Sequence, residues 1–400
     1  MSTTAGQQVR VDRPTRLGLA LIGILLIAAN LRVSFVSVGP VLGDIRTDLG
    51  LGAAAAGFLT SLPLVGFAVF SPLAPAVGRR LGLERTLWAA LAVLAGGILL
   101  RSAALPGALW IGTGLLGLGI AFLNVLLPGL VKRDFPHRAG GVTGIYFSLA
   151  TIVAALGSGL VVPIAGDAPD GWRLALGVWA GLALLALAWF LPKLRRRTAA
   201  AAAATGPVPA YRSPWTSALG WQVTLFMGLQ SLPFFVFATW LPSIEASHGV
   251  DAATSGWHLF WFQLCGMLGS LGITAVVNRL PDQRLVGAAA SLLALAAYLG
   301  LMLVPALSLL CTVLLGLACG SSIVLALSFF SLRTRHHQQA AALSGMAQSV
   351  GYLLAAAAPI GFGALYDLTG SWTLPLGLTA VLMVFMGIFA VLAGRRRYIG

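Results

Sequence analysis

The sequence predicts an all-α membrane protein in which twelve transmembrane helices form two pseudo-symmetric six-helix bundles. Three observations support this prediction. The 400 residues are 58% hydrophobic and only 9% charged, with a mean hydropathy of +0.92, whereas a soluble domain carries about 25% charged residues. The apolar residues are grouped in twelve runs long enough to cross a bilayer. The second half of the chain also repeats the pattern of the first.

Each expected span is a run of about 20 mostly apolar residues. Backbone groups in lipid must be bonded within their own segment, so the runs are expected to be helices. They lack the alternation of period two that is typical of a β-barrel. The first run is too long for a cleaved signal peptide and is expected to be the first span. The expected spans are 17–41, 52–77, 86–104, 107–131, 140–164, 174–192, 217–243, 255–277, 285–303, 306–330, 339–365 and 373–394.

The loops between spans differ in their content of Lys and Arg, which favour the cytoplasmic side. With the N-terminus in the cytoplasm, 21 of the 25 basic residues lie in cytoplasmic segments. Three others, Arg46, Arg101 and Arg173, are assigned to the outer side, and Arg32 lies within the first span. We therefore expect a multi-pass protein of the bacterial cytoplasmic (inner) membrane with both termini in the cytoplasm. The basic residues form short clusters between apolar runs, so the charge of +14 does not indicate binding to nucleic acid.

The longest connection between spans, KLRRRTAAAAAATGPVPAYRSPW at 193–215, lies midway along the chain. It is basic, then rich in alanine, and then contains proline. This composition is typical of a linker on the cytoplasmic side. We therefore expect an N-terminal six-helix bundle at 1–192, a cytoplasmic linker at 193–216 and a C-terminal six-helix bundle at 217–400.

The two halves align at a spacing of about 200 residues. LGLGAAAAGF (49–58) aligns with HGVDAATSGW (248–257). Just upstream, Pro40 is expected to end the first helix as Pro242 ends the seventh. Two parallel six-helix repeats related by an axis along the membrane normal describe the major facilitator architecture. This arrangement predicts a substrate site near the midplane, between the halves.

Several motifs resemble one family within that superfamily, the cyanate and 2-nitroimidazole transporters. The similarity is carried by GLQSLPFFVFATWLPSI (228–244), SGWHLFWFQLCG (255–266) and LSGMAQSVGYLLAAAAPIGFGALYDLTGSW (343–372). NVLLPGLVKRDFP (124–136) and NLRVSFVSVGPVL (30–42) fit as well. The resemblance covers nearly the whole chain and is specific to the family rather than to a substrate. It implies transport of a small solute.

Arg32 is the one basic residue assigned to neither side of the membrane, and we expect the helix around it to be unbroken. No Asp or Glu occurs between Leu17 and Asp44, and all eleven acids are expected outside the spans or at their ends. A guanidinium stays protonated in proteins, and burying it without a partner is costly. Ionisable residues within the membrane usually mark a substrate or ion path. We therefore expect an anionic substrate to balance Arg32. The alternative is a structural arginine that bonds buried carbonyls or lies in a water-filled vestibule.

Polar and aromatic residues on the helices that line the cavity of this fold complete the expected site. In the seventh span, Gln230, Phe234, Phe237 and Leu241 form one stripe, and the repeat places Phe234 opposite Arg32. Ordinary packing is the alternative for Phe234, and a helix–helix hydrogen bond is the alternative for Asn124. His258 is a candidate proton relay near the outer end. The expected substrate-binding residues are Arg32, Asn30, Asn124, Tyr146, Gln230, Phe234, Trp261, Gln263, Gln348 and Tyr352.

The sequence contains no P-loop, metal cluster or nucleophile–base pair, so we expect no ATP drive, cofactor, metal or catalytic site. The predicted function is a secondary active transporter of a small anionic or strongly dipolar solute, cyanate-like or nitro-heterocycle-like, working by alternating access. One alternative is an exporter of neutral planar drugs or metabolites, with Arg32 mainly structural. Another is a receptor or channel-like protein that does not transport. The expected partners are a small-molecule substrate and the lipid bilayer, and the protein is expected to be a monomer. Coupling to a proton or another ion stays open.

Overall fold

The computed structural model describes residues 14–168, 170–192, 213–277, 279–335 and 337–399. Within these residues every regular element is a helix. Twelve helical segments are long and apolar enough to cross a membrane. The predicted class, an all-α protein with twelve transmembrane helices, is confirmed. Most of the expected linker at 193–216 lies outside the described residues.

The first half of the chain contains six spans, three of which are interrupted. The first span combines α1 (Pro14–Asn30), α2 (Val33–Val36), η1 (Gly39–Val41) and α3 (Leu42–Leu49). The others are α4 (Ala53–Phe70) with η2 (Ser71–Leu73) and α5 (Ala74–Leu81), α6 (Leu83–Ser102), α7 (Ala108–Asp134), α8 (Ala139–Ala165), and α9 (Gly171–Gly177) with α10 (Ala180–Phe190).

The second half contains six further spans that are more regular. After η4 (Pro214–Thr216) they are α11 (Ala218–Ala246), α12 (Ala252–Val276), α13 (Arg284–Leu303), η5 (Pro305–Leu307) with α14 (Ser308–Leu332), α15 (His337–Thr369) and α16 (Thr373–Ala393).

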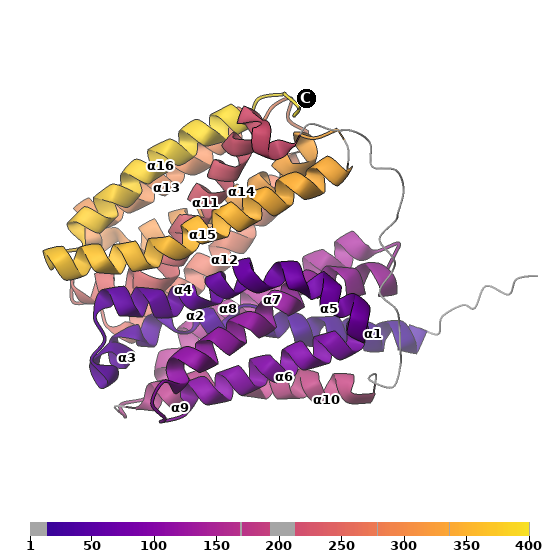
Figure 1. The fold of residues 1–400 in the computed structure, drawn as a ribbon. Helices are drawn as coiled ribbons and strands as arrows, with labels where there is room; N and C mark the ends of the chain where they lie inside the picture. Colours follow the sequence, from indigo (N-terminus) through magenta and orange to yellow (C-terminus); the bar gives the residue numbers. More distant parts are fainter. Residues whose placement is uncertain (1–13, 169, 193–212, 278, 336, 400) are drawn as a thin grey trace, which may run out of the picture.

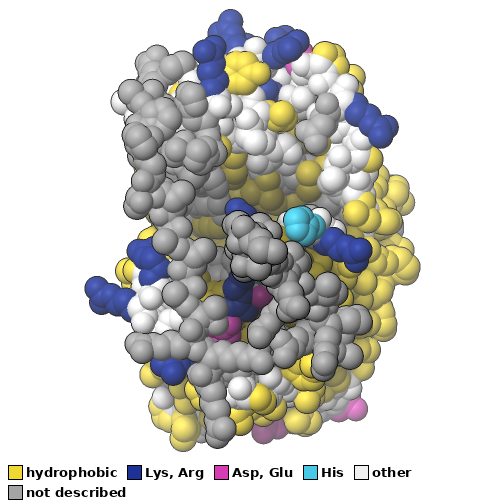
Figure 2. Space-filling view, turned by 90° about the vertical axis from the view of Figure 1, so that its right-hand side faces the viewer, with side chains coloured by type: hydrophobic (Ala, Val, Ile, Leu, Met, Phe, Trp, Pro, Cys, Tyr) yellow, Lys and Arg dark blue, Asp and Glu magenta, His cyan; other side chains and the backbone are white. Residues whose placement is uncertain are grey.

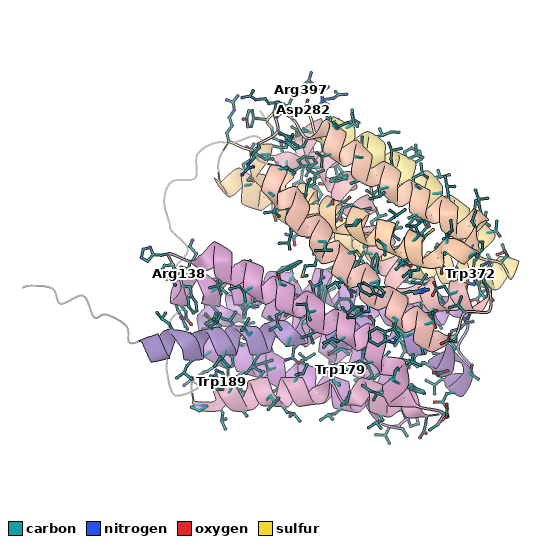
Figure 3. The ribbon with its side chains drawn as sticks, turned by 180° about the vertical axis from the view of Figure 1, so that it is seen from behind. Arg138, Trp179, Trp189, Asp282, Trp372 and Arg397 are labelled. Atoms are coloured by element: carbon teal, nitrogen blue, oxygen red, sulfur yellow. The ribbon has the colours of Figure 1, made fainter. Side chains whose placement is uncertain are left out.

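The helices form two groups, α1–α10 and α11–α16, that converge at one end and diverge at the other (Figure 1). We name these the closed end and the open end. The closed end holds α3, the start of α4 and the end of α15. Figure 3 shows Trp372 there, whereas Arg138 and Arg397 lie at the open end. Seen from the open end, the molecule is hollowed between the two groups, with hydrophobic side chains inside the hollow and Lys and Arg around it (Figure 2).

At the closed end the two halves pack backbone against backbone. A Cβ atom at Gly57 of α4 would lie 2.3 Å from the Pro359 carbonyl oxygen of α15. At Gly256 of α12 it would lie 2.7 Å from the Ser158 carbonyl oxygen of α8. Only glycine permits such an approach, as in other close contacts between membrane helices. One hydrophobic core therefore runs through both halves at this end.

The prediction of an unbroken first helix was wrong. α1 ends at Asn30, and α2 begins at Val33, with Leu31 and Arg32 in a turn between them. The side chain of Asn30 donates a hydrogen bond to the Leu26 carbonyl at 2.8 Å. Side-chain bonds of this kind compete with the helical ladder. Arg32 therefore lies at a break in the span.

The expected ends at Pro40 and Pro242 were also wrong. Pro40 lies in η1, and the chain continues through α3 to Leu49. Pro242 lies inside α11, which continues to Ala246. Pro40 occupies one of the first positions of η1, where a proline is tolerated. Pro242 interrupts the backbone bonding inside α11, whose neighbouring residues Leu241 and Ile244 are buried.

Two charges expected in outer segments or at span ends are buried within helices. Arg101 of α6 has no exposed surface, and its Nη1 donates to the Ser34 carbonyl at 2.6 Å. Glu245 of α11 is 1% exposed, and its Oε1 lies 2.6 Å from Nδ1 of His258. Each has one hydrogen-bonding partner on another segment, and such bonds lower the cost of burying a charge. The local sequence does not show such partners.

Candidate substrate-binding site

Arg32 occupies the turn between α1 and α2, and its side chain is half-buried. Among the described residues, no ion pair and no side-chain hydrogen bond includes its guanidinium. The described helices therefore hold a permanent positive charge at a helix break without a compensating carboxylate.

Two aromatic rings, one from each half, face the guanidinium. The Cζ atom of Arg32 lies 5.2 Å from the ring centroid of Phe147 in α8. It lies 5.5 Å from the ring centroid of Phe234 in α11. Cation–π contacts at these distances contribute about 0.5–2 kcal/mol each. The predicted proximity of Phe234 to Arg32 is confirmed, and the cation lies at the junction of the two halves.

Phe147 was not among the expected residues. Its neighbour Tyr146, on the same span, was expected instead. Successive helical residues point about 100° apart, so the two side chains face different surroundings. Tyr146 is 9% exposed and packs in the core of the first half with Ile24 and Ile27. The sequence feature that could have pointed to Phe147 is that it is an aromatic residue next to Tyr146 on a span expected to line the cavity.

Tyr352 of α15 is half-buried and interacts electrostatically with the Arg32 guanidinium. A phenol both donates and accepts hydrogen bonds. Of the expected residues, the structure therefore brings Phe234 into contact with Arg32, and Tyr352 lies within electrostatic range of the same cation.

A wall of aromatic rings extends from Phe234. Its centroid lies 5.1 Å from that of Phe235 and 5.6 Å from that of Phe262. Phe235 also lies 6.4 Å from Phe35 of α2, across the junction of the halves. Phe237, from the same expected stripe, is 2% exposed and packs behind the wall. The wall therefore offers flat, apolar surface next to a cation.

Four expected amides are turned toward their own helices or buried. The Asn30 amide is fully buried and bonded to Leu26, as described above. Gln230 donates to the Met227 carbonyl at 3.1 Å and to Ser231 Oγ at 2.7 Å. Gln348 donates to Ser344 Oγ at 2.7 Å. Gln263 is 3% exposed, and its Nε2 has no partner among the described residues. No described contact joins these amides to Arg32.

Asn124 and Trp261 are exposed side chains. Asn124 of α7 forms no hydrogen bond with a described residue, so the structure does not show the helix–helix bond considered for it. The Trp261 ring packs edge-on against Phe260 with centroids 5.4 Å apart. Neither residue contacts Arg32 in this structure.

Arg101 supports the segment that carries Arg32. Its bond to the Ser34 carbonyl joins α6 to α2, two residues beyond Arg32. Bonding a buried carbonyl is the structural role that was the alternative for Arg32, and here Arg101 has it. The part of the first span that follows the break is thus held by the fully buried guanidinium of Arg101.

Comparisons with known proteins agree with this architecture. The family model described as Major Facilitator Superfamily matches residues 20–355. The 2-nitroimidazole transporter of Escherichia coli (strain K12) is 44% identical over 377 residues, which cover 94% of this chain and 95% of that protein. The cyanate transport protein CynX of the same organism is 26% identical over 383 residues, covering 93% and 96%.

A solved structure shows the same fold at low sequence identity. It is that of a bacterial homolog to the human lysosomal transporter Spinster, in an inward-facing and unoccupied conformation. The TM-score is 0.77 at 15% identity, and the match covers 96% of this chain and 98% of that one.

Proposed function

The chain belongs to the Major Facilitator Superfamily, and we propose that it is a secondary active transporter of a small anionic or strongly dipolar solute. Its family and relatives are transporters rather than enzymes, and it is a multi-pass membrane protein whose partners are the bilayer and a small molecule.

The observation that carries the proposal is the uncompensated Arg32 between Phe147 and Phe234. A guanidinium offers a planar set of donors that suits a carboxylate-like or cyanate-like anion. The surrounding helices lower the local dielectric and so strengthen the attraction. Flat rings on two sides favour a flat solute, because stacked or edge-on aromatic contacts add to burial. The Tyr352 hydroxyl supplies a further hydrogen bond to an oxygen or nitrogen of the solute.

The relatives support the same class of solute. Proteins named for 2-nitroimidazole and for cyanate align with nearly all of this chain. Cyanate is a small anion, and 2-nitroimidazole is a small planar ring with a polar nitro group. Both fit a site that combines one cation with aromatic faces.

We further propose that the two halves, 1–192 and 217–400, rock about this site as rigid bundles joined by a cytoplasmic linker at 193–216. The open end is then the cytoplasmic end, because Lys and Arg gather around the hollow there (Figure 2). We accordingly propose that both termini are cytoplasmic. The structure then represents the inward-facing state of an alternating-access cycle.

Uptake into proteoliposomes tests the proposal. Labelled cyanate and labelled 2-nitroimidazole are offered to vesicles that contain purified wild-type protein or Arg32→Gln. We expect uptake by the wild type and at least a tenfold loss for the anion in the variant. Arg284→Gln is the matched control, because it removes the same charge at an exposed ion pair with Asp282 and should transport normally. Equal uptake of the anion by Arg32→Gln and the wild type would refute the assigned role.

A second candidate function is export of neutral planar compounds. The observation that favours it is the pair of cation–π contacts, which already stabilise Arg32 without an anion. In that case Arg32→Gln would still move 2-nitroimidazole, and cyanate would not be a substrate of the wild type.

A further inference from the structure

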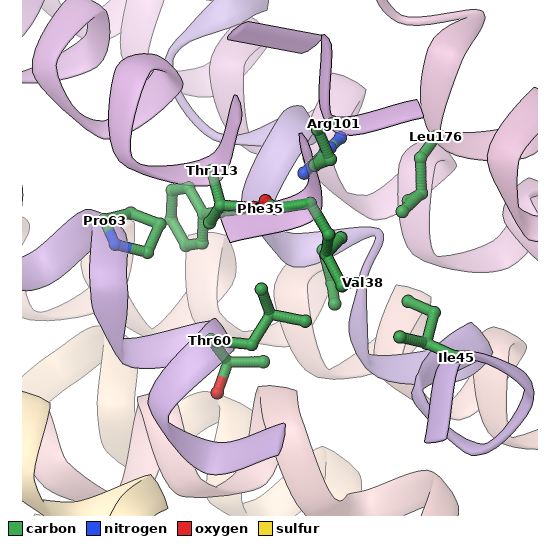
Figure 4. Close-up of a pocket in the computed structure, with 10 residues that line it drawn as sticks. Phe35, Val38, Ile45, Thr60, Pro63, Arg101, Thr113 and Leu176 are labelled. Atoms are coloured by element: carbon green, nitrogen blue, oxygen red, sulfur yellow. Dashed lines mark hydrogen bonds between the residues drawn. The ribbon is translucent and has the colours of Figure 1, made fainter. Parts of the chain in front are cut away.

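A second arginine lies away from the proposed substrate site, inside the first half near the closed end. Arg101 lines a small cavity of about 10 Å³ together with residues of the first span, α4, α7 and α9 (Figure 4). Most of the lining is apolar, including Phe35, Val38 and Leu176. The hydroxyl of Thr113 also lines the cavity and donates to the Leu109 carbonyl at 2.6 Å.

The Arg101 guanidinium is only partly satisfied by the protein. It is fully buried, and of its donors Nη1 bonds the Ser34 carbonyl. Its Nε and Nη2 atoms have no partner among the described residues. An arginine is almost never fully buried without a partner, and a buried N–H group that lacks an acceptor costs about 1–3 kcal/mol or more when charged.

The acids at the same end of the molecule are bonded elsewhere or exposed. Asp48 pairs with Arg173 at 3.1 Å and accepts a bond from Trp172 at 3.2 Å. Asp367 accepts backbone bonds at the start of α4. Asp44 is exposed. Among the described residues, no ion pair therefore neutralises Arg101.

We propose that the cavity beside Arg101 binds one monatomic anion of halide size, with chloride as the abundant candidate. The volume is close to the minimum for one water molecule. A halide ion is slightly larger, so its entry requires a small outward shift of the apolar lining, and the cavity excludes sulfate or phosphate. The free Nε–H and Nη2–H groups donate to the ion. A water molecule would satisfy a donor but would leave the charge buried without a counter-ion. The site does not depend on the proposed substrate.

The bound ion stabilises the first half and the broken span. Arg101 lines the cavity and also donates to the carbonyl of Ser34, two residues from Arg32. An anion that neutralises Arg101 therefore stabilises this bond, and with it the position of the segment that carries Arg32. The expected effect is on thermal stability, because a ligand that binds only the folded protein raises its melting temperature in a concentration-dependent way.

Melting temperatures of the purified full-length protein test this. Sodium gluconate is replaced stepwise by sodium chloride or bromide at constant ionic strength, with sulfate as the large-anion control. We expect a saturable rise on the order of a few degrees with either halide, whereas sulfate should give only the gradual, non-saturating stabilisation of an excluded salt. Arg101→Gln should lose the rise, whereas Arg32→Gln should keep it. Absence of a halide effect in the wild type, or an equal effect in Arg101→Gln, would overturn the proposal and leave water as the occupant.

Two further measurements keep the test decisive if Arg101→Gln does not fold. Val38→Ile adds one methyl group to the cavity wall while keeping the arginine, and it should reduce the halide effect. Crystals grown in bromide should show an anomalous peak beside the Arg101 guanidinium. A peak found only beside Arg32, or a full halide effect in Val38→Ile, would contradict the assignment to this cavity.

Discussion

Asp367, near the end of α15, accepts a hydrogen bond from the backbone amide of Ala53, the first residue of α4, at 2.9 Å. Its second carboxylate oxygen accepts from the amide of Ala54 at 2.8 Å. Unpaired amides and the helix dipole make the start of a helix attractive to a carboxylate. Here the cap comes from the other half of the chain. Asp367 therefore fastens the two halves together at the closed end.

Asp367→Asn is expected to loosen the closed end. The substitution removes the charge and one acceptor. Losing a cap costs about 0.5–2 kcal/mol, which is enough to shift the equilibrium between a closed and an opened closed end several-fold. A cysteine introduced at Val161, which is fully buried at this end, should then react faster with a maleimide. Asp251→Asn is the matched control. Asp251 caps α12 within one half by accepting from Thr254 at 2.9 Å, so labelling at 161 should not change.

Gly57→Ala is expected to prevent the closed end from forming. Its Cβ would lie 2.3 Å from the Pro359 carbonyl oxygen, which is backbone and cannot turn away. Substrate transport should fall at least tenfold while the protein still folds, because the two halves can separate at this contact. Gly361→Ala, on the facing helix α15, meets nothing within 4 Å and should transport normally. Normal transport by Gly57→Ala would show that this contact is not part of the cycle.

Phe234→Ala and Phe237→Ala separate binding from packing. Phe234 faces Arg32 and is partly buried, so its loss should weaken substrate binding with a moderate effect on stability. Phe237 is 2% exposed behind it, and its loss should cost about 3–5 kcal/mol of stability with binding preserved. Melting temperature and equilibrium binding of labelled solute, measured on both variants, check this. The reverse pattern would move the site away from Phe234.

Arg32→Lys tests the need for a planar fork. Lysine keeps the charge but loses the bidentate geometry and stacks less well on aromatic faces, so we expect weak binding and slow transport. Arg32→Gln should not bind an anion, yet it should fold, since no ion pair among the described residues is broken. The measurement is the melting temperature of each variant with and without solute. Full solute-induced stabilisation of Arg32→Gln would remove the anion role.

His258→Leu is expected to destabilise the second half. Its Nδ1 is bonded to the buried Glu245, whose other oxygen has no partner among the described residues. Removing one member of a buried pair typically costs about 3–5 kcal/mol. Glu245→Gln keeps a hydrogen-bonding side chain and should be better tolerated. Melting temperatures of the two variants give the comparison, and equal stability of wild type and His258→Leu would show that the pair contributes little.

The class of the protein was already determined by properties that can be read along the chain. Apolar length predicts a membrane span without knowledge of its neighbours, because the bilayer acts on each segment separately. The repeat and the motifs identified the family, and the alignment of the halves brought Phe234 opposite Arg32. The structure places those two residues in contact.

Only the tertiary structure decided how charges and backbone groups are satisfied. Arg101 was assigned to the outer side from the sequence, but it is buried and bonds Ser34, 67 positions away. Asp367 caps a helix 314 positions away, and Phe147 rather than Tyr146 faces Arg32. The break at Arg32 likewise depends on side-chain bonds and packing around α1 and α2. Hydropathy sums over a segment and is insensitive to which face a residue occupies, whereas a hydrogen bond or a cation–π contact depends on a few ångströms set by how distant helices pack.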